Sequence, residues 1–78
     1  MGKIESLLTL REQQVMELVA EGLTNNEICE KLFIARGTLD KHLAHIYSKY
    51  KVRTGNTTDI GIIRLRLVLK HFELEGLL

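Results

Sequence analysis

Two capping boxes, each placed just before an apolar run, constrain the fold of this chain more than any other feature. The first reads T-L-R-E (Thr9 to Glu12) and the second T-N-N-E (Thr24 to Glu27), which begins two residues after Gly22. In a capping box, a threonine oxygen and a glutamate three residues later bind backbone N–H groups that the first helical turn leaves without partners. The sequence therefore predicts a first helix over residues 10–21 that stops at a glycine, and a short second helix over residues 25–32.

The segment T-L-D-K-H-L-A-H-I-Y-S-K-Y predicts a longer third helix, over residues 36–49. Its apolar residues recur at the spacing of one helical face and are expected in the core: Leu39, Leu43, Ile46 and Tyr50. The second helix is expected to turn Ile28, Cys29 and Leu32 inward. The turn over residues 33–35 is apolar, without glycine or proline, and we expect it to pack with both helices onto the first helix.

The last apolar segment is ambiguous, because I-R-L-R-L alternates as a strand would. Its length and the absence of partner strands favour a helix over residues 57–73, capped by Asn56 and Asp59. One apolar sector is expected in the core: Ile60, Ile63, Leu67 and Leu74. A second sector remains and is expected at a dimer interface: Ile62, Leu65, Leu69 and Phe72. The alternative is a helix buried on both sides within a larger parent protein.

Length and composition indicate one domain, residues 1–78, in a reducing compartment. The single cysteine excludes an internal disulfide framework. No apolar run approaches the roughly 18 residues that span a bilayer, so a cytoplasmic location without a membrane partner is expected. Net charge is −3 over residues 1–35, +4 over residues 36–53 and zero over residues 54–78. Positive charge concentrated on one element is typical of a surface that binds a polyanion; a solvated basic face is the alternative.

Catalytic and metal chemistry find little support in the sequence. There is no acid–base dyad, activated nucleophile or glycine-rich phosphate loop, so neither an enzyme nor a cofactor is expected. His42 and His45 are three residues apart, but nothing nearby completes a metal site. We interpret His42 as a half-buried structural residue and Cys29 as part of the core.

Several short motifs occur at fixed spacing between Leu8 and Val52. They are L-T-L-R-E with Val15, G-L-T-N-N-E-I at residues 22–28, L-F-I at residues 32–34, T-L at residues 38–39 with His42, and Ile46, Lys49, Tyr50 and Val52. Together they resemble the LuxR/FixJ/GerE-type helix-turn-helix DNA-binding domain of bacterial transcription regulators. The resemblance implies an all-α, four-helix domain with a helix-turn-helix unit over residues 24–50. Its third helix would enter the major groove, and its fourth would mediate dimerisation on an inverted-repeat site.

The chain departs from the family pattern at the ends of the third helix and within it. Ala35 stands where the family has a serine N-cap, and Asp40 occupies an outward position commonly held by lysine. V-R-T-G-N-T-T is longer than the family's V-x-N-R-T, and Thr57 replaces its arginine. Dimer geometry is therefore less firmly implied than the DNA-binding fold.

By resemblance, the base-reading positions are Asp40, Lys41 and Ala44. Lys41 can donate to guanine and Ala44 can touch a thymine methyl. Asp40 can accept from a cytosine amine, pair with Lys41 or Arg36, or reject wrong sequences. The remaining candidates would hold backbone phosphates through hydroxyls, helix-end N–H groups and charge: Thr24, Asn25, Asn26, Arg36, Thr38, His45, Lys49 and Lys51. For Lys51 and Arg53, a solvated surface role stays open.

These features predict the function at the level of class: a dimeric transcription regulator that binds double-stranded DNA sequence-specifically. RNA polymerase or another regulator is a further candidate partner. The alternative is a helix-turn-helix module that binds another regulator instead of DNA. Because relatives usually carry an N-terminal receiver or sensing domain, the chain is expected to be either a stand-alone regulator or the output domain of a longer protein.

Overall fold

A computed structural model of the chain describes residues 8–52 and 60–76, and in these ranges it has four helices and no strand. The helices are α2 (Leu10–Ala20), α3 (Asn25–Leu32), α4 (Arg36–Tyr50) and α5 (Ile60–Leu74). The all-α prediction is confirmed, and both ends of α2, α3 and α4 and the C-terminal end of α5 lie within one residue of their expected positions. I-R-L-R-L lies inside α5 and is not a strand. The expected start of the last helix at residue 57 and its capping pair fall outside the described residues.

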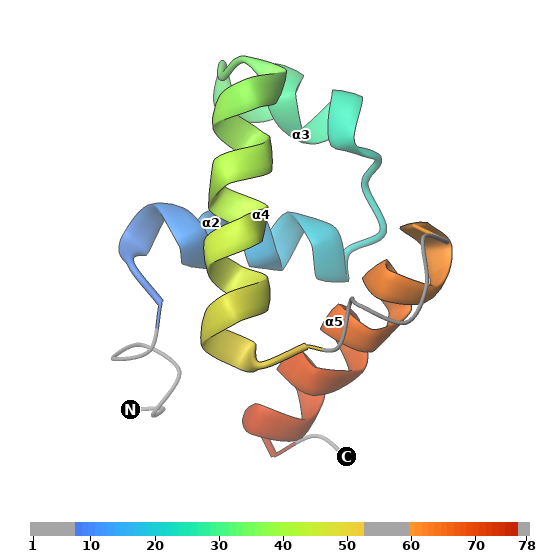
Figure 1. Ribbon diagram of the computed structural model, residues 1–78. Coiled ribbons are helices and arrows are strands. Elements are labelled where there is room, and N and C mark those ends of the chain that lie inside the picture. Colours follow the sequence, from blue (N-terminus) through green and yellow to red (C-terminus); the bar gives the residue numbers. More distant parts are fainter. Residues whose placement is uncertain (1–7, 53–59, 77–78) are drawn as a thin grey trace.

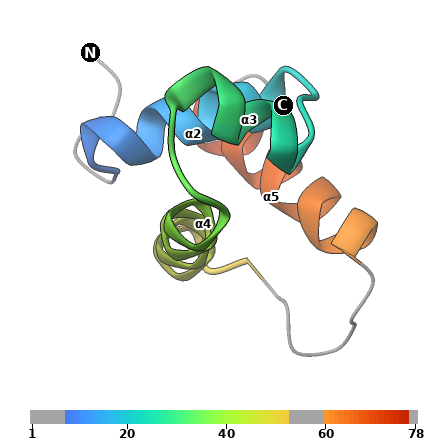
Figure 2. The same cartoon turned by 90° about the horizontal axis from the view of Figure 1, so that it is seen from above.

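The helices are arranged around α4, which crosses α2 in Figure 1 with α3 near one end and α5 near the other. Viewed along its axis in Figure 2, α4 has α2, α3 and α5 on one side and no described helix on the opposite side. One long side of α4 therefore remains outside the packed part of the domain. Within the two described ranges, no helix has the length and apolarity needed to cross a membrane.

Both capping boxes form as the sequence predicts. The Thr9 hydroxyl accepts from the Glu12 amide at 3.2 Å, and the Glu12 carboxylate accepts from the Thr9 amide at 3.1 Å. At α3, the corresponding distances between Thr24 and Glu27 are 3.2 Å and 2.7 Å. A threonine N-cap contributes about 1 kcal/mol to helix stability, so the two boxes fix where both short helices begin. By contrast, Ala35 begins α4 without a side-chain cap, as its methyl group requires.

The turn between α3 and α4 differs from expectation at one residue. Ile34 packs against the core, but Phe33 is 93% exposed and does not pack onto α2. Phe33 is the C-cap of α3 and has a left-handed backbone conformation, with φ of 57°. This conformation reverses the chain direction after α3 and turns the ring outward, while the next residue points inward. The apolar composition of the turn did not reveal this alternation.

The core combines one face of each of the first three helices with the middle of the last. The expected buried stripe of α4 is confirmed. Also buried are Ile28 of α3 and three residues of α2, Val15, Leu18 and Val19. Cys29 and Leu32 are half-buried against the core. The buried apolar residues are Leu8, Val15, Met16, Leu18, Val19, Ile28, Leu39, Leu43, Ile46, Tyr50 and Leu67. Full burial of one such side chain contributes about 1.5–3 kcal/mol, so this cluster is what holds α4 on the domain.

The core-facing sector of α5 is shorter than expected. Leu67 is fully buried, but Ile60 and Leu74, which were expected to lie beside it, are exposed. His71, one turn after Leu67, is buried instead, with Nδ1 2.9 Å from the Tyr50 hydroxyl and the two rings stacked at 6.0 Å. A straight helix that crosses a small domain contacts the core only along its middle. The polar His71 can occupy this buried position because Tyr50 satisfies its ring nitrogen.

Candidate nucleic-acid interface

The outward side of α4 carries polar and charged side chains that lie in solvent, while its opposite stripe is buried. The exposed residues of this side are Arg36, Thr38, Asp40, Lys41, Ala44 and His45. The helix has 15 residues and is therefore about 22 Å long. With side chains an α-helix is about 10–12 Å wide, and the major groove of B-DNA is about 12 Å wide. The outward side of α4 is thus sized for a major groove.

The three residues expected to read bases lie together on this side of α4. Asp40 and Ala44 are four residues apart, and Lys41 and Ala44 are three apart, so these side chains are neighbours on the helix surface. All three are exposed. A donor, an acceptor and a methyl group therefore occupy adjoining positions, which is the combination that base edges in the major groove can distinguish.

Asp40 is paired with an arginine of the same helix. Arg36 Nε donates to Asp40 Oδ1 at 3.2 Å, and both side chains are more than half exposed. One of the alternatives for Asp40, pairing with Arg36, is therefore confirmed in the DNA-free chain. Exposed ion pairs of this kind contribute about 0.3–0.5 kcal/mol, so the pair separates at little cost when either group meets a stronger partner.

The N-terminus of α3 presents backbone donors beside a side-chain link to α5. The capping box uses the amides of Thr24 and Glu27, and the amides of Asn25 and Asn26 complete the first turn, where helices favour anions. The Asn25 side chain accepts from Arg64 Nη1 at 2.8 Å, and Arg64 Nη2 donates to the Leu23 carbonyl. This end of α3 is therefore attached to α5.

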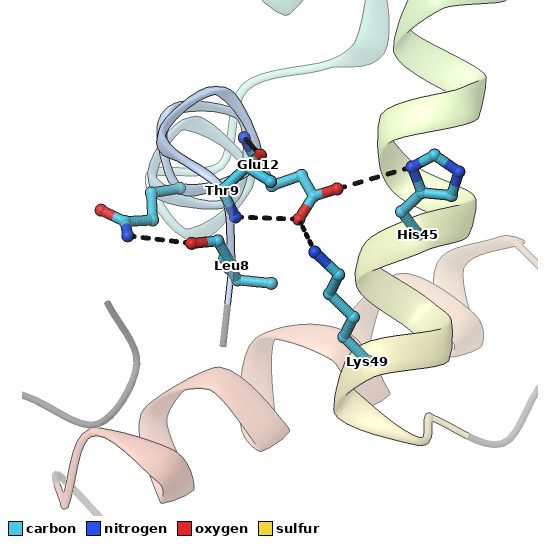
Figure 3. A network of polar contacts seen from close by, with 6 residues as sticks. Leu8, Thr9, Glu12, His45 and Lys49 are labelled. Atoms are coloured by element: carbon cyan, nitrogen blue, oxygen red, sulfur yellow. Dashed lines mark hydrogen bonds and ion pairs between the residues drawn. The ribbon is translucent and has the colours of Figure 1, made fainter. Parts of the chain in front are cut away.

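A buried carboxylate lies beneath the C-terminal half of α4 (Figure 3). Glu12 of α2 is 4% exposed, and its carboxylate lies 2.6 Å from Lys49 Nζ and 3.5 Å from His45 Nδ1. Burial raises the pKa of Glu12, but the Lys49 hydrogen bond, the Thr9 amide and the charges of Lys49 and His45 outweigh it, and the pKa is lowered. Glu12 is therefore an anion that orients two side chains of α4.

The basic residues near the C-terminal end of α4 differ in their surroundings. Lys49 is about two-thirds covered and bonded to Glu12, whereas Lys51 is exposed just beyond the helix, in a left-handed conformation with φ of 57°. The predicted phosphate contact of Lys49 would have to share its ammonium with Glu12. Lys51 lies at the opposite end of α4 from Arg36, so the candidate phosphate contacts flank the base-reading residues along the helix.

Reasoning from the sequence missed three polar residues that support this surface: Glu12, Arg64 and His71. Glu12 was recognised only as a capping residue. Its spacing to Val15 and Val19, three and seven residues on, is the signal that places it on the inner face of α2. No local signal marks Arg64 or His71, because their partners, Asn25 and Tyr50, are 39 and 21 residues away in the sequence.

His42, which was considered as a metal ligand, and the single cysteine, Cys29, are both packed as structural residues. His42 is half-buried, as expected, and Cys29 is half-buried against the core. Among residues 8–52 and 60–76, no three His, Cys, Asp or Glu side chains come together as a metal site would require.

Comparison with known proteins agrees with this arrangement of helices. The family described as bacterial regulatory proteins, luxR family (GerE), matches residues 6–58, which include all of α2, α3 and α4. The chain belongs to the LuxR family. The resemblance noted from its motifs is thus confirmed, and the α3–turn–α4 unit is the helix-turn-helix of a family of DNA-binding transcription regulators.

Three LuxR-family relatives align with between 58% and 83% of this chain. The transcriptional regulatory protein LnrK of Bacillus subtilis (strain 168) is 42% identical over 57 residues, 73% of this chain and 26% of LnrK. LiaR of the same organism is 49% identical over 45 residues, 58% of this chain and 21% of LiaR. The HTH-type transcriptional regulator AlkS of Alcanivorax borkumensis is 35% identical over 65 residues, 83% of this chain and 7% of AlkS. The chain therefore spans about a quarter or less of these relatives. No solved structure matches it significantly.

Proposed function

We propose that this LuxR-family domain binds double-stranded DNA sequence-specifically and regulates transcription, with the outward side of α4 in the major groove. The observation that carries the proposal is the two-sidedness of α4. Its apolar stripe is fully buried, while Asp40, Lys41 and Ala44 lie exposed together on the opposite side. In this arrangement Lys41 donates to guanine and Ala44 contacts a thymine methyl. Asp40 accepts from a cytosine amine after Arg36 has moved from it to a phosphate.

The phosphate contacts would flank these base contacts. The candidates are Thr24, Asn25, Asn26, Arg36, Thr38, His45, Lys49 and Lys51. At the start of α3, Asn25 and Asn26 offer backbone N–H groups, whereas the Thr24 amide already donates to Glu27. The candidates at the two ends of α4 offer charge, and such contacts fix the register of a helix on the duplex without reading sequence. The net charge of +4 over residues 36–53 supports this assignment.

Dimerisation through α5 would place two copies on an inverted repeat. Four apolar residues form the proposed interface, of which three are exposed and the last is half-buried: Ile62, Leu65, Leu69 and Phe72. An apolar row on a helix of a soluble domain is stabilised when a second copy covers it, and a two-fold symmetric dimer matches the symmetry of a palindromic site. Within the bacterial cytoplasm, RNA polymerase or another regulator would be the next partner of the DNA-bound form.

Titration of a fluorescent random duplex with the chain, at several salt concentrations, tests the proposed function. Binding at low salt should weaken linearly on a log–log scale, with a slope of about −0.9 per phosphate contacted. Selection of bound sequences from a random pool should then yield a defined operator. Absence of binding at low salt would reject the proposal and favour a module that binds another regulator through α5 or the Asp40 side of α4.

A further inference from the structure

Arg64 is the feature of α5 that neither the core nor the apolar interface explains. It lies on the half-buried side of the helix, near Leu67, and its side chain extends away from α5 to the segment that enters α3. There it donates from Nη1 to the Asn25 side chain at 2.8 Å and from Nη2 to the Leu23 carbonyl. A single guanidinium thus bridges two groups on either side of Thr24.

The segment that Arg64 holds is the short connection between α2 and α3, whose Leu23 side chain also packs against the core. Gly22 has a left-handed backbone, with φ of 94°, and the Leu23 amide donates to the Leu18 carbonyl at 3.1 Å. From there the chain passes directly into the Thr24 capping box. A planar guanidinium with two N–H groups in a fixed fork restrains both acceptors at once, which a lysine ammonium cannot reproduce.

The charge of Arg64 is also felt on α4. Burial raises the pKa of the Tyr47 phenol, and the Arg64 charge opposes that increase. By its hydrogen bonds, Arg64 joins α5 to the start of α3. Its charge there is directed at protein acceptors.

We infer that Arg64 is a positioning residue for DNA binding: it fixes the Leu23–Asn25 segment, and thereby the backbone donors at the start of α3, in the orientation that meets a phosphate. This inference rests on the proposed function. It adds that contact between α3 and the DNA backbone depends on α5, the helix assigned to dimerisation. The two helices then act as one unit on the operator.

Three variants and one control separate this role from a simple effect of charge. Arg64→Met removes both hydrogen bonds, Arg64→Lys keeps the charge without the fork, and Asn25→Ala removes one acceptor. Lys70→Met is the matched control, because Lys70 is also a cation of α5 and pairs with Glu73 of that helix at 3.4 Å. Circular dichroism first establishes that each variant is folded at the temperature of the binding assay.

The expected result is a loss of DNA affinity of about tenfold for both Arg64→Met and Arg64→Lys, the effect of losing a hydrogen bond to a charged group. Lys70→Met should bind nearly as the unmodified chain does. The double variant Arg64→Met/Asn25→Ala should be no weaker than the worse single variant, since both changes act on one link. Full affinity in Arg64→Met, rescue by Arg64→Lys, an equal loss in Lys70→Met, or additive losses would each overturn the inference.

A DNA-independent measurement distinguishes failure of this inference from failure of the proposed function. In the DNA-free chain, Arg64→Met should accelerate amide hydrogen exchange at Leu23 and Glu27, whose amides donate to the Leu18 carbonyl and the Thr24 hydroxyl, while leaving exchange in the middle of α4 unchanged. Unchanged exchange at Leu23 and Glu27 would contradict the positioning role even if DNA binds. Conversely, accelerated exchange in a chain that fails to bind any duplex would reject the proposed function and retain the link between α5 and α3.

Discussion

Lys49 Nζ lies 2.6 Å from the carboxylate of Glu12, a residue 37 positions earlier in the chain. The same carboxylate accepts the Thr9 amide, so one side chain caps α2 and binds α4 (Figure 3). Because Glu12 is almost completely buried, its charge depends on these partners. The capping box that marks the start of α2 in the sequence is therefore also a tertiary contact.

Acid should destabilise the fold through Glu12. Its pKa is lowered below the ordinary value of 4.5 in the folded chain, so its contribution to stability is complete above that value and is lost as pH falls through the lowered pKa. Urea unfolding followed from neutral pH to about pH 3 should show this loss. Glu12→Gln should be less stable at neutral pH and less sensitive to acid. Glu17→Gln, an exposed change on the same helix, should keep the acid sensitivity of the unmodified chain.

Lys49→Met should destabilise the chain by about 2 kcal/mol, because the Glu12 carboxylate remains buried after its ammonium partner is removed. Urea unfolding at neutral pH measures this change. We expect Lys49→Met also to weaken binding to all DNA sequences, for two reasons: the lost phosphate contact and the displacement of α4. Unchanged stability would show that Glu12 is satisfied without Lys49.

The contact between Tyr50 and His71 joins α4 to α5. Burial and the nearby Glu75 charge raise the pKa of Tyr50 to about 12. The folded state therefore keeps Tyr50 neutral, and this contribution to stability is complete below the ordinary value of 10.0 and lost as pH rises through about 12. Tyr50→Phe should cost about 1 kcal/mol, since His71 Nδ1 loses its buried partner. Thermal unfolding measures the cost, and alkaline spectrophotometric titration of the unmodified chain should show tyrosinate only well above pH 10.

Lys41 and Lys51 should affect DNA binding in different ways. Lys41→Ala should reduce discrimination between the preferred operator and single-base variants by about 1–3 kcal/mol at the base that it contacts. Lys51→Ala should weaken all sequences alike and lower the salt slope by about 0.9, as removal of one phosphate contact requires. Competition titrations with operator variants at two salt concentrations measure both effects. Equal loss for all sequences in Lys41→Ala would assign Lys41 to the backbone instead.

Local features of the sequence predicted most of the fold. The two capping boxes fixed the starts of α2 and α3, and the apolar period of Leu39, Leu43 and Ile46 fixed the buried face of α4. These signals lie within one helix, where geometry follows directly from spacing. Contacts between helices depend on crossing angles that spacing does not encode, so the bond from Arg64 to Asn25 could not be predicted. Phe33 was misplaced for a similar reason, because composition does not reveal a left-handed turn.

The candidate DNA-binding surface likewise has features that spacing within one helix predicts and contacts between helices that it does not. Exposure of Asp40, Lys41 and Ala44 followed from the period of α4 and is confirmed, whereas their contacts with bases stay a prediction. The role of Lys49 changed most, because the sequence presented it as one more cation of a basic helix. Only the packing of α2 beneath α4 revealed its bond to Glu12.

Chemical-shift mapping of the isotope-labelled chain, as a selected operator duplex is added at low salt, tests the central claim most directly. The largest changes should occur on the outward side of α4, with further changes at Asn25 and Asn26; the outward residues are Arg36, Thr38, Asp40, Lys41, Ala44 and His45. Residues of the buried stripe should change little. Changes confined to α5, or changes absent at every duplex concentration, would contradict a major-groove role for α4.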